Sequence, residues 1–139
     1  MTGFVVDASI AVASLTPEVG SADARPIMIE AKAAGVVGPA HLTLEVVNAL
    51  LVKSRRGSID DDYRSEAIRR LGAYGILVDT PRDPSAVIER VIGLADRHRL
   101  TAYDAAYLEL AQRMGATLAS FDGDLRRAAE AEGVPVRPK

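Results

Sequence analysis

The sequence predicts an open α/β domain, with a parallel sheet of about five short strands covered by helices on both faces. The first observation is that short, continuous apolar stretches, such as residues 3–6 and 116–120, recur along the 139-residue chain. Strands buried on both faces of a parallel sheet have this pattern, whereas half-exposed strands alternate. The second observation is that segments with helical periodicity separate these stretches, as crossover helices do. We therefore expect a single domain over residues 1–139.

The individual elements follow from apolar runs and from the residues that start and stop helices. Apolar runs bounded by Gly, Pro or Asp predict the strands, and Ser, Thr, Asp or Pro at the start of a periodic segment predicts the helix starts. We expect strands at 3–6, 35–38, 76–80, 116–120 and 134–136, and helices at 7–15, 21–34, 39–56, from 58 onwards, 84–98, 102–114 and 123–132.

Two of these helices have features of their own. Pro39 is well placed to open the helix that runs to about Arg56, and because this segment is apolar nearly all round we expect it to be buried. The next helix begins with three consecutive aspartates at 60–62, whose charges favour the positive end of the helix dipole. Consecutive side chains point in different directions, so we do not expect these acids to converge on one ion.

Composition excludes several classes of protein. There is no cysteine, which excludes disulfides and thiolate zinc sites, and the net charge of −2 does not indicate a nucleic-acid binder. Fourteen of the seventeen cations are arginine, in short clusters, but with six Phe and Tyr residues a platform for stacking bases is not expected. The apolar run at 8–15 is too short to span a membrane and lacks the basic start and small-residue cleavage site of a signal peptide, so we expect a cytoplasmic protein.

Asp104 is an unusual acid, because it is set into the apolar surface of its helix. It lies on the same side as Leu108 and Ala111, and burying an ionised carboxylate is costly unless it is paired or bound to a metal. Taken alone, it fits a capping box that starts at Thr101. The polar sector of the helix lies across from Asp104 and consists of Glu109, Gln112 and Arg113.

Three further acids fall where an α/β active site is expected. Active sites of open α/β sheets lie beyond the carboxyl ends of the strands. Asp7 directly follows the first strand and Asp122 follows the fourth, whereas Glu45 lies on the 39–56 helix among apolar neighbours. Each has a structural alternative, since the two aspartates fit helix caps and Glu45 fits an ion pair with Lys53 or Arg56. Together with Asp104, they favour one shared acidic site.

At these residues the chain resembles a family. The segments "VVDASIAV", "EVVNAL", "LTAYDAAYLELA" and "TLASFDGDL" are similar, in order and spacing, to those of PIN domains, and more narrowly of VapC-type toxin ribonucleases. The resemblance covers residues 4–136. It implies that Asp7, Glu45, Asp104 and Asp122 are catalytic acids that bind Mg²⁺ or Mn²⁺, directly or through water. The residues that it places in supporting roles are Ser9, Asn48, Ser120 and Asp124, of which Asp124 is an alternate acid.

The resemblance also implies a reaction and partners. A divalent cation held by carboxylate oxygens activates water and stabilises the charge that develops on a phosphate, and Glu45 or Asp104 would orient that water. The implied activity is an endoribonuclease that leaves 5′-phosphate and 3′-hydroxyl ends. The implied partners are an RNA substrate, a VapB-type antitoxin and a second copy of the chain, joined through apolar faces of the early helices.

Two other functions stay open at this point. A receiver-like signalling domain also has an acid after its first strand, but it would need paired acids there and a late lysine, and Asp7 stands alone. A catalytically silent PIN-like binding module is the second alternative, and only the intact set of four acids opposes it.

Overall fold

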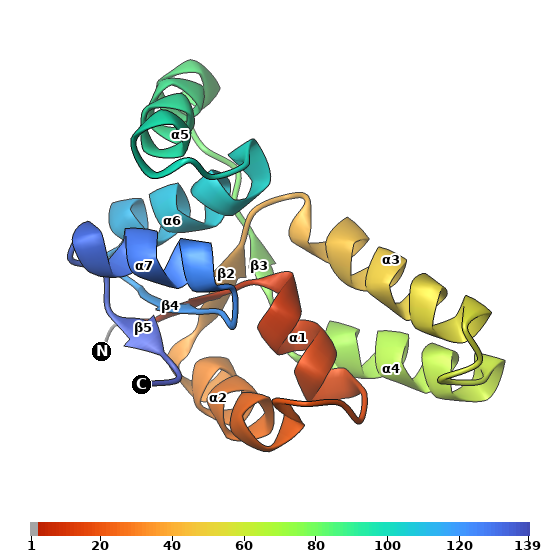
Figure 1. Cartoon of the computed structure of the whole chain (residues 1–139). Coiled ribbons are helices and arrows are strands. Elements are labelled where there is room, and N and C mark those ends of the chain that lie inside the picture. The colour runs from red at the N-terminus through yellow and green to blue at the C-terminus, as the bar shows by residue number, and fades with distance from the viewer. Residues whose placement is uncertain (1–2) are drawn as a thin grey trace.

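A computed structural model describes residues 3–139, with the elements arranged as in Figure 1. Its strands are β1 (Phe4–Val6), β2 (Val36–Gly38), β3 (Leu77–Val78), β4 (Thr117–Ala119) and β5 (Val136–Arg137). Its helices are α1 (Ala8–Leu15), α2 (Ser21–Ala34), α3 (Leu42–Arg55), α4 (Asp61–Ala73), α5 (Pro84–His98), α6 (Ala102–Met114) and α7 (Gly123–Ala131). No helix in this part of the chain is long and apolar enough to cross a membrane.

The five strands form one parallel sheet in the order β3-β2-β1-β4-β5, which confirms the predicted fold class. The chain therefore turns back at β1, so that β1 and β4 are neighbours although more than a hundred residues separate them. A receiver-like domain has the order 2-1-3-4-5 instead. The observed order rules that alternative out.

Both faces of the sheet are covered, because alternate side chains of the central strand enter different cores. Val5 packs with Leu118 and the buried residues of α3, α6 and α7, whereas Phe4 and Val6 pack with α2. All three residues of β1 are buried. This explains why the strand is apolar throughout rather than alternating.

Helix α3 is less buried than the sequence predicts. Only Leu42, Val46 and Leu50 are buried, and Leu44 is 72% exposed. The reason is that α3 packs mainly against α1 and α4, and the α3–α4 pair extends away from the sheet (Figure 1). The prediction that this helix is covered all round is wrong.

Helix α6 is also covered differently from the prediction. Tyr103 and Met114, on its apolar side, are more than half exposed, whereas Glu109, in the predicted polar sector, is 2% exposed. Helix α5 packs against this sector and brings Arg90 to Glu109. The sector is thus polar because it holds a buried ion pair.

Candidate functional site

Asp7 is a buried carboxylate at the carboxyl end of β1. It is the N-cap of α1, where its Oδ1 accepts hydrogen bonds from Ile10 N at 3.2 Å and Ser9 Oγ at 2.5 Å. Its Oδ2 accepts from Ser120 Oγ at 2.5 Å. With 5% of its surface exposed, Asp7 is in a setting that favours the neutral form, and burial raises its pKa from 3.8 to about 6.

The two hydroxyls that contact Asp7 also hold the loop after β4. Ser9 Oγ accepts from Phe121 N, and Ser120 Oγ accepts from Asp122 N, each at 3.0 Å. Asp122 in turn is the N-cap of α7 and accepts from Leu125 N at 2.8 Å. Ser9 and Ser120 therefore link Asp7 to the segment that carries Asp122.

Asp104 lies in the first turn of α6, half-buried and close to the other acids. Thr101 is the N-cap of this helix and its Oγ1 accepts from Asp104 N at 3.1 Å, as the capping motif predicts. Burial raises the pKa of Asp104, and the charges of Asp122, Glu45 and Asp124 raise it further. Such repulsion is the expected behaviour of carboxylates gathered at one site.

Glu45 is held in position by two side chains that sequence reasoning did not assign to the site. Tyr107 donates a hydrogen bond from its hydroxyl to Glu45 Oε1 at 2.8 Å, and His41 Nε2 lies 3.3 Å from the same oxygen without hydrogen-bond geometry. The His41 ring packs edge-on against Tyr103 and Tyr107. Burial and the nearby Glu45 raise the pKa of Tyr107, so its hydroxyl stays protonated as a donor.

Sequence spacing only weakly indicates that His41 and Tyr107 lie near the acids. His41 precedes Glu45 by one helical turn, and Tyr107 follows Asp104 by one turn. The alternative ion pairs of Glu45 are wrong, because Lys53 pairs instead with Glu18 at 2.6 Å and Glu45 contacts Tyr107.

Two of the supporting residues are exposed and form no hydrogen bond with the four acids. Asn48 is exposed on α3, and its side chain makes no hydrogen bond with the rest of residues 3–139. Asp124 is exposed and pairs with Arg127, although its charge still acts on Asp104. The structure thus brings Ser9 and Ser120 into direct contact with Asp7, but not these two.

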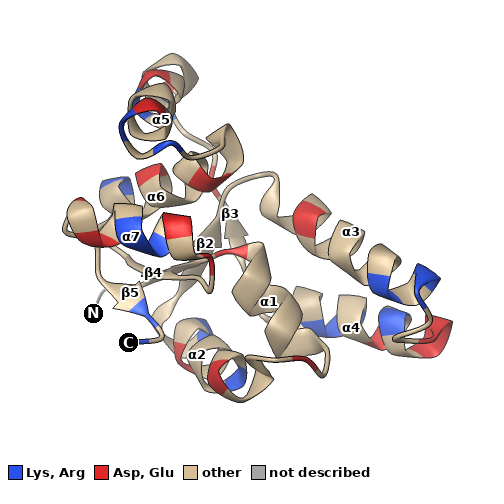
Figure 2. Cartoon of the chain, in the orientation of Figure 1, with Lys and Arg blue, Asp and Glu red and all other residues tan. Residues whose placement is uncertain are grey.

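The acids come from four elements that meet at one edge of the sheet. In Figure 2 the acidic segments at the end of β1 and near the starts of α3, α6 and α7 face a common region. Within residues 3–139, no three Asp, Glu, His or Cys side chains lie close enough together to hold an ion by themselves. The donors are all oxygen, which fits Mg²⁺ or Mn²⁺, cations that keep several waters when bound.

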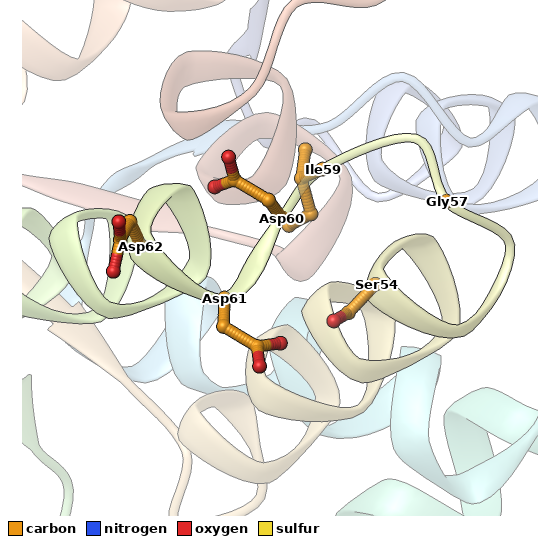
Figure 3. Close-up of a pocket in the computed structure, with 6 residues that line it drawn as sticks. All are labelled: Ser54, Gly57, Ile59, Asp60, Asp61 and Asp62. Carbon is orange, nitrogen blue, oxygen red and sulfur yellow. The ribbon is translucent and has the colours of Figure 1, made fainter.

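A second group of acids lies away from this region, between α3 and α4. Asp60, Asp61 and Asp62 line a pocket of about 540 Å³, and Figure 3 shows their carboxylates pointing apart. Asp60 is the N-cap of α4 and accepts from Tyr63 N at 2.7 Å. The prediction that these acids serve the helix start without converging is confirmed.

The raised pKa of Asp7 predicts a pH dependence of stability. The pKa of Asp7 is about 6 in the folded protein and 3.8 ordinarily, so the folded state is stabilised while Asp7 is protonated. This contribution to the free energy of unfolding is lost as the pH rises from about 4 to above 6. A shift of about two units corresponds to roughly 3 kcal/mol. In metal-free urea unfolding, we expect the wild type to lose about this much more stability than Asp7→Asn between pH 4 and pH 7.5; parallel pH profiles would contradict the prediction.

Comparison with known proteins identifies the family to which this chain belongs. The PIN domain family model matches residues 4–131, nearly the whole chain, and the protein belongs to this family. Ribonuclease VapC3 of Pyrobaculum aerophilum is 31% identical over 121 residues, which cover 87% of this chain and 90% of the relative. The resemblance seen in the sequence is therefore confirmed.

Solved structures show the same fold. PAE2754 from Pyrobaculum aerophilum matches with a TM-score of 0.71 at 23% identity, over 97% of this chain and 83% of that one. VapC20 of Mycobacterium tuberculosis, described as a toxin that cleaves the sarcin-ricin loop, matches with 0.66 at 19% identity over 91% and 95%. FitAcB from Neisseria gonorrhoeae matches with 0.62 at 18% identity over 96% and 95%.

Proposed function

We propose that this chain is a Mg²⁺- or Mn²⁺-dependent endoribonuclease, built as a single PIN domain. The observation that carries the proposal is that acids from four elements lie close together around Asp104, since besides burial the charges of Asp122 and Glu45 raise its pKa, and its own charge raises that of the buried Asp7. The chain also belongs to a family with a ribonuclease relative. A binding module without catalysis would not need acids that raise one another's pKa, as Asp104 shows.

The roles of the residues follow from their contacts. Asp7, Asp104 and Asp122 would hold the cation with Glu45, and the bound cation supplies charge neutralisation at the scissile phosphate and an activated water. Ser9 and Ser120 fix both oxygens of Asp7. The hydroxyl of Tyr107, on α6, holds Oε1 of Glu45, on α3, and leaves the second oxygen of Glu45 free to orient water.

Incubation with total RNA tests the activity. With Mg²⁺ or Mn²⁺ we expect discrete cuts whose mapped ends are 5′-phosphate and 3′-hydroxyl, and none in the presence of EDTA. Cleavage that survives EDTA, or that leaves cyclic phosphates, would overturn the proposed mechanism.

Cation binding should also be visible as stability. Without a cation the clustered acids repel one another, so Mg²⁺ or Mn²⁺ is expected to raise the Tm, by the equivalent of about 2.7 kcal/mol at a hundred times the Kd. We expect Asp7→Asn to lose this shift and Asp62→Asn, in the separate group of acids, to keep it. Thermal scans with and without cation measure all three, and an equal shift for Asp7→Asn would speak against a shared site.

We further propose that the protein is the toxin of a toxin–antitoxin pair in the cytoplasm, inhibited by a VapB-type antitoxin. The basis is the VapC3 relative, 90% of which this chain covers. Exposed apolar side chains on the early helices, such as Ile29 and Leu44, offer surface for a homodimer. A short upstream reading frame for a DNA-binding partner, and co-purification of the two products, would test the pairing.

A further inference from the structure

A groove runs from the acidic site along the surface between α1 and α3. Its volume is about 440 Å³, and its lining includes Glu45, one of the four acids, and Ser9, which donates to Asp7. The small or β-branched side chains that line it are Ala8, Val12, Ala49 and Val52. The groove is thus continuous with the proposed catalytic site, since Glu45 belongs to both.

The far end of this groove has the opposite charge. Lys53 and Arg56 line it there, and Figure 2 shows α3 acidic in its first turn and basic in its last turns. From Glu45 to Arg56 the helix rises roughly 16 Å, at about 1.5 Å per residue. A chain of phosphates that enters the acidic site therefore has cations to meet a few nucleotides away.

Of the two cations, Lys53 is paired with an acid and Arg56 is not. Lys53 Nζ lies 2.6 Å from Glu18 Oε2, and Glu18 also lines the groove. Arg56 is exposed, and its guanidinium makes no hydrogen bond or ion pair with other residues in 3–139. A planar fork of donors that is free in this way suits the bidentate binding of a phosphate.

We propose that the groove between α1 and α3 is a subsite for the RNA strand next to the scissile phosphate, with Arg56 binding a backbone phosphate. The inference rests on the proposed ribonuclease function and assigns part of its substrate site. The charge gradient favours RNA as the occupant, since a cation at the acids and Arg56 at the other end match a continuous polyanion. Glu18 opposes this binding through its negative charge and through its ion pair with Lys53.

The test compares two adjacent arginines. Arg56→Gln removes the unpaired cation that lines the groove, and Arg55→Gln is the matched control, because Arg55 is also exposed at the end of α3 but does not line the groove. With a labelled single-stranded RNA that the wild type cuts, we expect Arg56→Gln to raise KM roughly five- to tenfold with kcat nearly unchanged, and to lower the salt slope of binding by about 0.7. Arg55→Gln should change neither value appreciably.

Binding without turnover gives a second readout. In an Asp104→Asn background, in which cleavage is slow, fluorescence anisotropy of the same RNA should show the loss of binding with Arg56→Gln. Glu18→Gln should tighten binding because it removes an acid and releases Lys53. Trimming the RNA one nucleotide at a time from each end should abolish the difference between wild type and Arg56→Gln once the contacted phosphate is gone. A merely structural effect of the substitution would persist at every length.

The outcomes separate this subsite from the nuclease itself. A wild type that cuts no RNA overturns the proposed function, and the subsite with it. A wild type that cuts RNA while Arg56→Gln and Arg55→Gln behave alike overturns the subsite alone. Labelled polyglutamate of equal charge is the probe for a protein partner: if it binds more tightly than the RNA and this binding is lost in Arg56→Gln, the groove serves an acidic peptide and the RNA proposal fails.

Discussion

Asp104→Ala is expected to lower the rate of RNA cleavage by about 10²–10³-fold, the range found when a preorganised electrostatic group is removed from an active site. Asp104 stands at the start of α6, half-buried and facing the charges of Asp122 and Glu45. Removing it takes away one oxygen ligand of the proposed cation. Single-turnover cleavage of a labelled RNA, with enzyme in excess, measures the effect on the chemical step.

The fold should survive this substitution, which makes the loss of rate interpretable. Burial and neighbouring acids raise the pKa of Asp104, so its charge is unfavourable in the folded protein without a cation. We therefore expect Asp104→Ala to have a metal-free Tm no lower than that of the wild type. Asp124→Ala is the control, because Asp124 is exposed and paired with Arg127 and should keep most of the rate. Undiminished cleavage by Asp104→Ala would mean that the reaction occurs at another site or comes from a contaminant.

Most of the fold was predictable because the strands and most helix starts have a local signal. The start of α3 was predicted wrongly at Pro39, because the helix begins at Leu42 and its N-cap His41 makes no side-chain capping bond. The continuous apolar runs at 3–6 and 116–120 became β1 and β4, adjacent strands whose buried side chains enter both cores. The third strand was predicted too long, at 76–80, whereas β3 is only Leu77–Val78 and lies exposed at the sheet edge. Pairing decides how much of an apolar run is strand, and an edge strand pairs on one side only.

The positions of the acids were predictable for a related reason. A parallel sheet places the ends of its strands together, so Asp7 and Asp122 could be assigned to one edge without knowledge of any contact. Their hydrogen bonds through Ser9 and Ser120 follow from β1 and β4 being neighbours. Asp104 and Glu45 stood out because each interrupts an apolar helical surface.

Contacts between elements distant in the sequence were not predictable in this way. The Tyr107–Glu45 hydrogen bond joins residues 62 positions apart, and nothing local to either residue indicates the partner. The burial of Glu109 depends on where α5 lies, since the sequence shows only that Glu109 belongs to a polar sector. Helix α3 was predicted to be buried because it is apolar, but no other element packs against part of its surface, so Leu44 is exposed.

Arg113→Ala is expected to give the largest loss of stability among the substitutions considered, about 3 kcal/mol, as when one partner of a buried ion pair is removed. Glu109 is 2% exposed, and its oxygens accept from Arg113 Nε at 2.9 Å and Nη2 at 3.0 Å, and from Arg90. Arg113 also donates to both oxygens of Asp79, at 3.0 and 2.6 Å. It thereby joins α6 to the residue that follows the edge strand β3.

Without Arg113, Glu109 would keep only the half-exposed Arg90, and Asp79 would lose its partner. A loss of this size should lower the Tm by roughly 6–12 °C for a chain of this length. Arg69→Ala is the control: Arg69 forms a similar ion pair with Glu66, but on the open surface of α4, where solvent screens it, so the Tm should hardly change. Equal Tm values for the two variants would mean that the buried network contributes no more than a surface pair. Because Arg113 lies at the opposite end of α6 from Asp104, cleavage measured well below the lowered Tm should persist in Arg113→Ala, which separates the residues that hold the fold from those that carry the reaction.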